Sequence, residues 1–179
     1  MPRKSSRPAS GSEHQFSHLW EMQGVHAPHG FKVGLGSLAM AALYEKLLEQ
    51  DFEPLDIPGL CRAWPTTVEL EQAVRASFAN PTLADRGVEE SLVKHLTPEQ
   101  LAARLRLLQQ AWPSLREKLS RQVWPVETMR RKLAAAGCPV DPQEIGLDEQ
   151  QVQQSYALAR RIRRRYTALD LAAETGWLP

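Results

Sequence analysis

The sequence is short of cysteine, of long apolar runs and of net charge, and each shortage excludes a class of protein. Its 179 residues include 2 cysteines, Cys61 and Cys138, which lie too far apart to form a metal-binding knuckle or a redox pair. No apolar run approaches the roughly 20 residues needed to span a bilayer. The formal net charge of +1 argues against a protein that coats nucleic acid or an anionic membrane. We therefore expect a soluble cytoplasmic protein with reduced thiols, with neither a membrane nor nucleic acid as a partner.

Strand signals are also almost absent, whereas apolar residues recur at helical spacing along the whole chain. The sequence therefore predicts an all-α fold, a multi-helix bundle. Pro113 is expected to end one helix, because proline has no N–H and clashes with the preceding turn. The expected helices cover residues 13–22, 29–49, 67–79, 83–95, 98–112, 114–122, 126–136 and 148–171.

No internal repeat, low-complexity tract or long linker divides the chain. We expect a single helical domain over residues 1–179, with residues 1–9 as a disordered or truncated start. Gly34 and Gly36 fall in the first turns of the second expected helix, where glycine is a poor helix former. These two glycines are expected to allow the close approach of another helix or of a substrate.

Four of the five histidines lie between residues 14 and 29. His14 and His18 are four residues apart, so on a helix they project from one face. His29 stands between Pro28 and Gly30, in a turn that can direct its imidazole back towards that face. Neutral imidazoles from two segments suit zinc, iron or nickel, so the cluster predicts a divalent metal site. The alternative is that these are ordinary surface or hydrogen-bonded histidines.

A third ligand is harder to find in the sequence. Glu13 and Glu21 are close by, but helical geometry turns Glu13 about 100° away from His14. The sequence therefore predicts an incomplete metal site, with no acidic residue obviously placed to complete it.

Several short motifs resemble the metal-binding half of the iron-containing alcohol dehydrogenase superfamily, and within it the sn-glycerol-1-phosphate dehydrogenases. Near the start these motifs are Gly11-Ser12-Glu13-His14, Ser17-His18, His29-Gly30 and Val33-Gly34. Further along, residues 136–139 and 144–147 are similar to a late loop of that family, and residues 163–171 to its terminal helix.

The resemblance implies roles for three histidines. His14 and His29 occupy the positions of the two histidine metal ligands. His18 falls where relatives place a cleft-lining histidine, which leaves open a catalytic role in proton transfer or substrate orientation and a plain packing role. His26 has no counterpart. The implied reaction is hydride transfer between NAD(P)H and dihydroxyacetone phosphate, which gives glycerol 1-phosphate.

The sequence contains no candidate for the family's nucleotide-binding domain or for the aspartate ligand that this domain supplies. Gly34-Leu35-Gly36 has no strand before it, so it is not a dinucleotide-binding turn, and we identify no cofactor-binding residues. NAD(P) is therefore expected only if that domain is supplied, and the chain alone is expected to have little or no dehydrogenase activity. The expected partners are a small phosphorylated substrate, a separate nucleotide-binding chain and a second copy of this chain.

Three alternatives stay open at this point. The chain could be the product of a truncated or frame-shifted gene. It could be a non-catalytic helical interaction module derived from such an enzyme. It could also be a relative that acts on glycerol or another small polyol, or in a dehydroquinate synthase-like reaction.

The densest charge cluster lies near the end of the chain, at residues 160–165. These arginines could contact a phosphate, but cations also suit the last turns of a helix. Ile162 and Tyr166 give the expected terminal helix an apolar stripe. We interpret the run as a solvated helix face, with one arginine available to contact a neighbouring domain.

Overall fold

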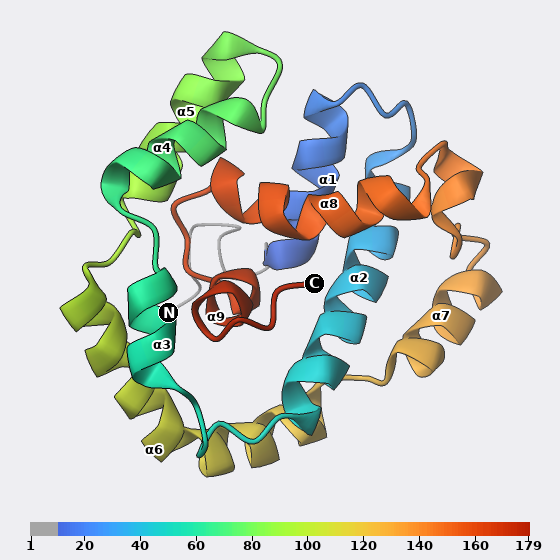
Figure 1. Cartoon of the computed structure of the whole chain (residues 1–179). Helices are drawn as coiled ribbons and strands as arrows, with labels where there is room; N and C mark the ends of the chain where they lie inside the picture. The colour runs from blue at the N-terminus through green and yellow to red at the C-terminus, as the bar shows by residue number, and fades with distance from the viewer. Residues whose placement is uncertain (1–10) are drawn as a thin grey trace, which may run out of the picture.

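The computed structural model describes residues 11–179, and every regular element in that range is helical (Figure 1). The all-α prediction is confirmed, whereas the expected start at residues 1–9 lies outside the described residues. The elements in chain order are α1 (Ser12–Met22), α2 (His29–Glu49), α3 (Ile57–Ala63), α4 (Thr67–Ala76), α5 (Pro81–Leu92), α6 (Pro98–Gln122), α7 (Val126–Ala135), the 3-10 turn η2 (Pro142–Ile145), α8 (Glu149–Ala159), the 3-10 turn η3 (Arg160–Ile162) and α9 (Ala168–Glu174).

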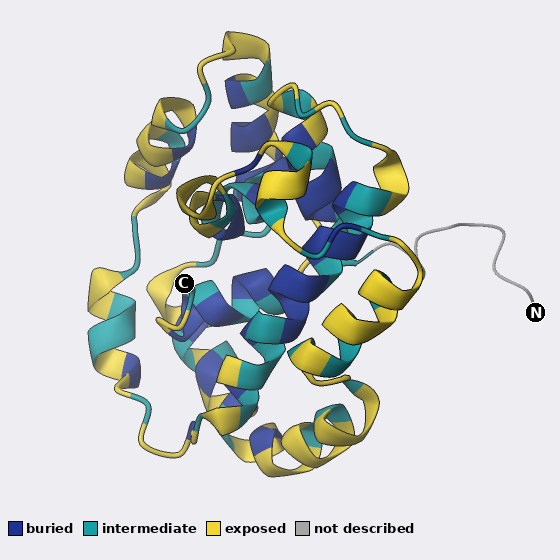
Figure 2. Cartoon of the chain, turned by 90° about the vertical axis from the view of Figure 1, so that its right-hand side faces the viewer, coloured by how far each residue is buried: buried dark blue, intermediate teal, exposed yellow. Residues whose placement is uncertain are grey.

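The main core is formed chiefly by apolar side chains of α1, α2, α6, α8 and α9. Figure 2 shows that the buried residues lie on the inward sides of the helices. α1 packs along α2 and also contacts α8, while α3 packs on α6. Polar atoms inside this core are paired: Trp20 donates its ring N–H to Ser155 Oγ at 2.8 Å, and the Tyr156 hydroxyl donates to the Ala39 carbonyl at 2.8 Å. Its largest fully buried side chains include Phe16, Leu19, Trp20, Leu43, Phe52, Leu101, Leu105 and Leu169. Within residues 11–179, no helix has both the length and the apolar character that crossing a bilayer requires.

A second, smaller core joins α4 to α5. It consists of Leu70, Val74 and Val88, with Phe78 and Leu92 packed against it. This helical hairpin meets the rest of the molecule mainly where α5 contacts η3. Glu90 of α5 accepts hydrogen bonds from the backbone N–H and the guanidinium of Arg164, which lies just after η3.

Pro113 does not end a helix, which corrects the expectation drawn from its chemistry. α6 runs without interruption from Pro98 to Gln122, and Pro113 lies on its exposed side. The residue before it, Trp112, is buried. Its ring packs at a tilt against Phe52, with 4.3 Å between ring centroids, and donates its N–H to the Gln50 carbonyl. Packing on both sides of the proline therefore outweighs its local cost of about 3 kcal/mol.

The expected terminal helix over residues 148–171 is also wrong. α8 ends at Ala159, the backbone becomes extended at Arg163 (φ −147°, ψ 140°), and α9 begins after Thr167. Asp170 explains the new start, because its carboxylate accepts from the backbone N–H of Thr167 at 2.9 Å and from its hydroxyl at 3.3 Å. The spacing of Thr167 and Asp170 is a capping box, which was available in the sequence as a start signal.

α7 is attached differently from its neighbours, since none of its residues is buried. It packs on α2 through partly buried side chains that include Met129 and Leu133. Its first N–H, from Val126, donates to Glu45 Oε1 at 2.8 Å, and Arg130 donates to the carbonyl of Val140 at 2.7 Å. The helix therefore lies on the surface of the core rather than inside it.

The two glycines of α2 face different neighbours. A methyl group placed on Gly36 would lie 2.6 Å from the backbone oxygen of Glu13 and 3.1 Å from Phe16 Cβ, both in α1. At Gly34 the nearest atom would be the flexible end of Leu133, at 3.5 Å. Gly36 is thus the point where the two helices come too close for any side chain, and the expectation of a close helix approach is confirmed there.

This difference predicts opposite effects for two matched substitutions. Gly36→Ala should lower the free energy of unfolding by about 1–3 kcal/mol, because the rigid backbone of α1 must shift. Gly34→Ala should leave it unchanged or raise it by up to about 1 kcal/mol, because alanine favours the helix and the contact is ordinary. Denaturant unfolding followed by circular dichroism measures both, and equal effects of the two substitutions would contradict the close approach.

The Glu90–Arg164 contact predicts a pH-dependent contribution to stability. The pKa of Glu90 is lowered, chiefly by the hydrogen bond from the Arg164 side chain. A carboxyl group whose pKa is lowered by folding stabilises the protein above its unfolded pKa and loses that effect as the pH falls through its folded value. Glu90→Gln should therefore lower the midpoint of thermal unfolding at pH 7, with the difference shrinking below about pH 4.

Glu89 offers the matched control, since its side chain is 70% exposed and lies 3.5 Å from Arg164. Glu89→Gln should have a smaller effect at every pH. A loss of stability in Glu90→Gln that does not change with pH would show that the contact does not depend on the charge of Glu90.

Candidate functional site

α1 and α2 bring the three predicted histidines together. His14 and His18 lie one turn apart on α1, and His29 is the first residue of α2, which returns along α1 after a short loop. The ring centroids are 5.6 Å apart for His14 and His29, 5.9 Å for His18 and His29, and 6.5 Å for His14 and His18. The predicted juxtaposition of these side chains is therefore present in the structure.

Each of the three rings directs its Nδ1 atom towards a carboxylate. Glu13 Oε1 lies 2.8 Å from Nδ1 of His14. Each carboxylate oxygen of Glu21 contacts one of the other two rings. Oε1 lies 2.9 Å from Nδ1 of His29, and Oε2 lies 3.3 Å from Nδ1 of His18. Helical geometry predicts that Glu13 projects away from His14, and this prediction is wrong because the flexible glutamate side chain turns back across the helix.

Glu21 makes more contacts at this site than the sequence predicted. Besides the two histidines, its Oε1 contacts Nζ of Lys32 at 3.3 Å and accepts from the hydroxyl of Ser17 at 3.5 Å. The hydrogen bond to His29 is the main cause that lowers the pKa of Glu21, to about 2, and Lys32 adds to the effect. The i, i+3 spacing of His18 and Glu21 was a usable signal for one of these contacts.

Lys32 is a second residue whose contacts at this site the sequence did not predict. It is a buried cation that pairs with Glu21. Its side chain is 6% exposed, and its ammonium also donates to the carbonyl of Val25 at 3.4 Å. With Lys32 paired to it, the Glu21 carboxylate is held in a fixed position. The pKa of the neighbouring His18 is lowered, chiefly by burial and further by the charge of Arg163.

The carboxylates determine which ring nitrogen remains available. An ionised carboxylate can only accept a hydrogen bond, so a neutral imidazole facing it must carry its proton on Nδ1. The lone pair is then on Nε2, the nitrogen that commonly binds metals when a carboxylate holds the other side of the ring. His14, His18 and His29 are therefore all prepared to offer Nε2 to a ligand.

The donor set for a metal is nevertheless incomplete within the described part of the chain. Among residues 11–179, no group of three or more histidine, cysteine, aspartate or glutamate side chains is arranged to enclose a metal ion. Glu13 and Glu21 face the histidines as hydrogen-bond partners. The described residues therefore bring imidazoles together without a full set of metal ligands.

The other histidines lie apart from this group. His26 is exposed in the loop between α1 and α2, where it lines a pocket of about 590 Å³ together with Phe31 and Cys138. His95 stacks on Trp64, with ring centroids 5.7 Å apart and planes inclined by 10°. The structure brings neither of them to the site.

The chain is similar to proteins named glycerol-1-phosphate dehydrogenase. It is 28% identical over 167 residues to the enzyme of Geobacillus stearothermophilus, a match that covers 90% of this chain and 32% of that enzyme. For Bacillus licheniformis the identity is 27% over 179 residues, covering 97% and 31%. A shorter stretch of 70 residues is 44% identical to the Korarchaeum cryptofilum enzyme and covers 36% of this chain and 21% of the relative.

The chain thus spans about a third of the length of the curated relatives that it matches. No model of a known protein family matches it, and no solved structure matches it. The similarity nevertheless extends over most of this chain and supports a relationship to glycerol-1-phosphate dehydrogenases.

The contacts with carboxylates predict the tautomers of the histidines. When neutral, His14, His18 and His29 should carry the proton on Nδ1, whereas His26, which no carboxylate contacts among the described residues, should not share this preference. Long-range ¹H–¹⁵N correlation spectra distinguish the two nitrogens of each ring. A proton on Nε2 of His29 would contradict the hydrogen bond with Glu21.

Proposed function

We propose that the chain is the helical, metal-binding half of a glycerol-1-phosphate dehydrogenase-like oxidoreductase, which interconverts dihydroxyacetone phosphate and glycerol 1-phosphate. The observation that carries this proposal is the convergence of His14, His18 and His29, each with its Nδ1 facing a carboxylate. The similarity to enzymes of that name supports it.

His14 and His29 are the proposed protein ligands of a divalent zinc, iron or nickel ion, each through Nε2. When bound, such an ion supplies Lewis-acid chemistry to a carbonyl or hydroxyl oxygen of the substrate. Two imidazoles alone hold a divalent ion weakly, so the proposed complete site takes a further ligand from outside this chain.

The chain's own residues have three proposed tasks at this site. Glu13 and Glu21 hold the imidazoles of His14 and His29 in the tautomer that leaves Nε2 free. Lys32 holds Glu21 in place through its buried ammonium. His18, one turn from His14, is the proposed group that exchanges a proton with the substrate hydroxyl.

The nicotinamide cofactor has to be bound elsewhere in this proposal. All regular elements of residues 11–179 are helical, whereas a dinucleotide-binding turn requires a preceding strand. The proposed hydride donor, NAD(P)H, is held by a separate domain or chain. Residues 1–179 alone should then bind metal but turn over substrate poorly.

Metal titration of matched variants tests the proposed ligands. His14→Ala and His29→Ala should each weaken Zn²⁺ binding more than roughly 100-fold. Removing a residue that only hydrogen-bonds to a metal ligand typically weakens binding by roughly 10–100-fold, so a larger loss indicates a direct ligand. His26→Ala is the control, because that histidine lies in the same loop region but outside the site. Isothermal titration calorimetry of the full chain measures all four proteins.

The outcomes separate the proposal from its rivals. Zn²⁺ affinities that are equal in all four proteins would reject the metal site and leave a helical interaction module. If the metal binds as proposed, activity assays with a relative's nucleotide-binding domain added in trans distinguish dihydroxyacetone phosphate from an unphosphorylated polyol as substrate.

A further inference from the structure

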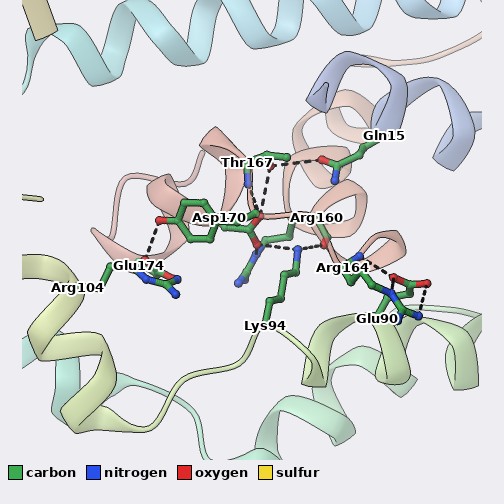
Figure 3. Close-up of polar contacts among 10 residues, drawn as sticks. Gln15, Glu90, Lys94, Arg104, Arg160, Arg164, Thr167, Asp170 and Glu174 are labelled. Carbon is green, nitrogen blue, oxygen red and sulfur yellow. Dashed lines mark hydrogen bonds and ion pairs between the residues drawn. The ribbon is translucent and has the colours of Figure 1, made fainter. Parts of the chain in front are cut away.

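A small cavity lies apart from the site of His14, His18 and His29, and its lining includes one other histidine, His95. Its volume is about 20 Å³, and its lining includes Ser91, Lys94, Arg160, Arg161 and Asp170. Figure 3 shows how Lys94 reaches from the segment after α5 towards Asp170 of α9 and towards Arg160. Three cations therefore gather around a space that accommodates about one water-sized sphere.

The carboxylates at this cavity do not balance the cations. Asp170 Oδ1 is shared by Nζ of Lys94 at 2.7 Å and Nε of Arg160 at 3.4 Å. Glu174, the other acidic residue of the lining, is paired with Arg104 at 2.7 Å and accepts from the Tyr166 hydroxyl at 2.9 Å. Lys94 and Arg160 together carry two positive charges, and Asp170 carries one negative charge. One positive charge is therefore left over even without Arg161.

Arg161 adds a second uncompensated charge. Its guanidinium donates to neutral acceptors, the carbonyl of Ala73 at 3.0 Å and the hydroxyl of Ser77, so it ties α4 to η3 without a carboxylate. Burial lowers the pKa of Arg161, and the only charge that adds to this shift is the like charge of Arg160. Arg161 as a whole is only partly buried, but its Nε atom is buried, and a charge that is buried without a counter-ion costs folding free energy.

Two polar atoms at the cavity lack partners. Among residues 11–179, Ser91 Oγ and Arg161 Nε are the buried side-chain nitrogen and oxygen atoms without a hydrogen bond. Ser91 is only 5% exposed, and both residues belong to the cavity lining. A buried donor left unpaired costs about 1–3 kcal/mol, so both atoms are available to bind a small ligand in the cavity.

We propose that this cavity binds a single small monovalent anion of the halide class, such as chloride. A halide accepts hydrogen bonds from Ser91 Oγ and Arg161 Nε and offsets the excess positive charge of Arg160 and Arg161. A water molecule would satisfy the donors but would leave the charge uncompensated. A space that admits about one water-sized sphere suits a monatomic anion.

Thermal unfolding of the full chain tests this site at constant pH and ionic strength, with sodium chloride replacing sodium gluconate. At ten times its dissociation constant, chloride should raise the unfolding midpoint by about 4 °C. Arg161→Gln should abolish this rise. Arg131→Gln, a change at an exposed arginine of α7, should keep it.

Two further readouts keep the test decisive if Arg161→Gln unfolds the hairpin. ³⁵Cl NMR of the wild-type chain should show line broadening that bromide competes away, and Ser91→Ala should reduce that broadening. An unbroadened signal, or a midpoint that is the same in both salts, would overturn the proposal. If Ser91→Ala is more stable than the wild-type chain, and chloride shifts the unfolding midpoint of neither protein, the cavity holds water only and the proposal is overturned.

Discussion

The histidine site depends on the direct approach of α2 to the backbone of α1. Gly36 permits this approach, because no side chain fits between it and the carbonyl of Glu13. The apolar faces of both helices then close over one core that includes Phe16, Leu19 and Leu43. The short loop after Met22 reverses the chain, so that His29 returns beside His14 and His18. A local backbone contact thus determines the spacing of three side chains that carry the proposed chemistry.

Much of the fold could be predicted from short-range signals. The bounds of α2 follow from Pro28 before it and from its apolar spacing, and the start of α6 follows from the capping box of Thr97 and Gln100. The expected breaks were less reliable. Local chemistry predicts a stop at Pro113, but the helix continues because Trp112 is anchored in the core. Such an anchor depends on residues far away in the sequence, which no local pattern contains.

The site shows the same division between local and distant information. The spacing of His14, His18 and His29 predicted that these side chains would meet, since it involves one helix face and one turn. Only the contact of Glu21 with His18 had such a local signal. The pairing of Glu21 with Lys32 could not be predicted in this way, because Lys32 reaches Glu21 only after α2 folds back on α1. The expectation for the arginine run holds only in part, for a related reason. Arg164 is 55% exposed, as expected of a solvated face, but Arg160 is largely buried against Asp170 of α9, and Arg164 also pairs with Glu90 of α5.

The position of α7 has a consequence for how the molecule opens. A helix without buried residues loses little apolar contact when it detaches, so its opening costs less free energy than global unfolding. Its backbone amides should therefore exchange with solvent ahead of those in α1 and α2. Because Ala134 of α7 and Gly137 just after it line the 590 Å³ pocket beside His26, detachment of α7 should change the size of that pocket while the core remains folded.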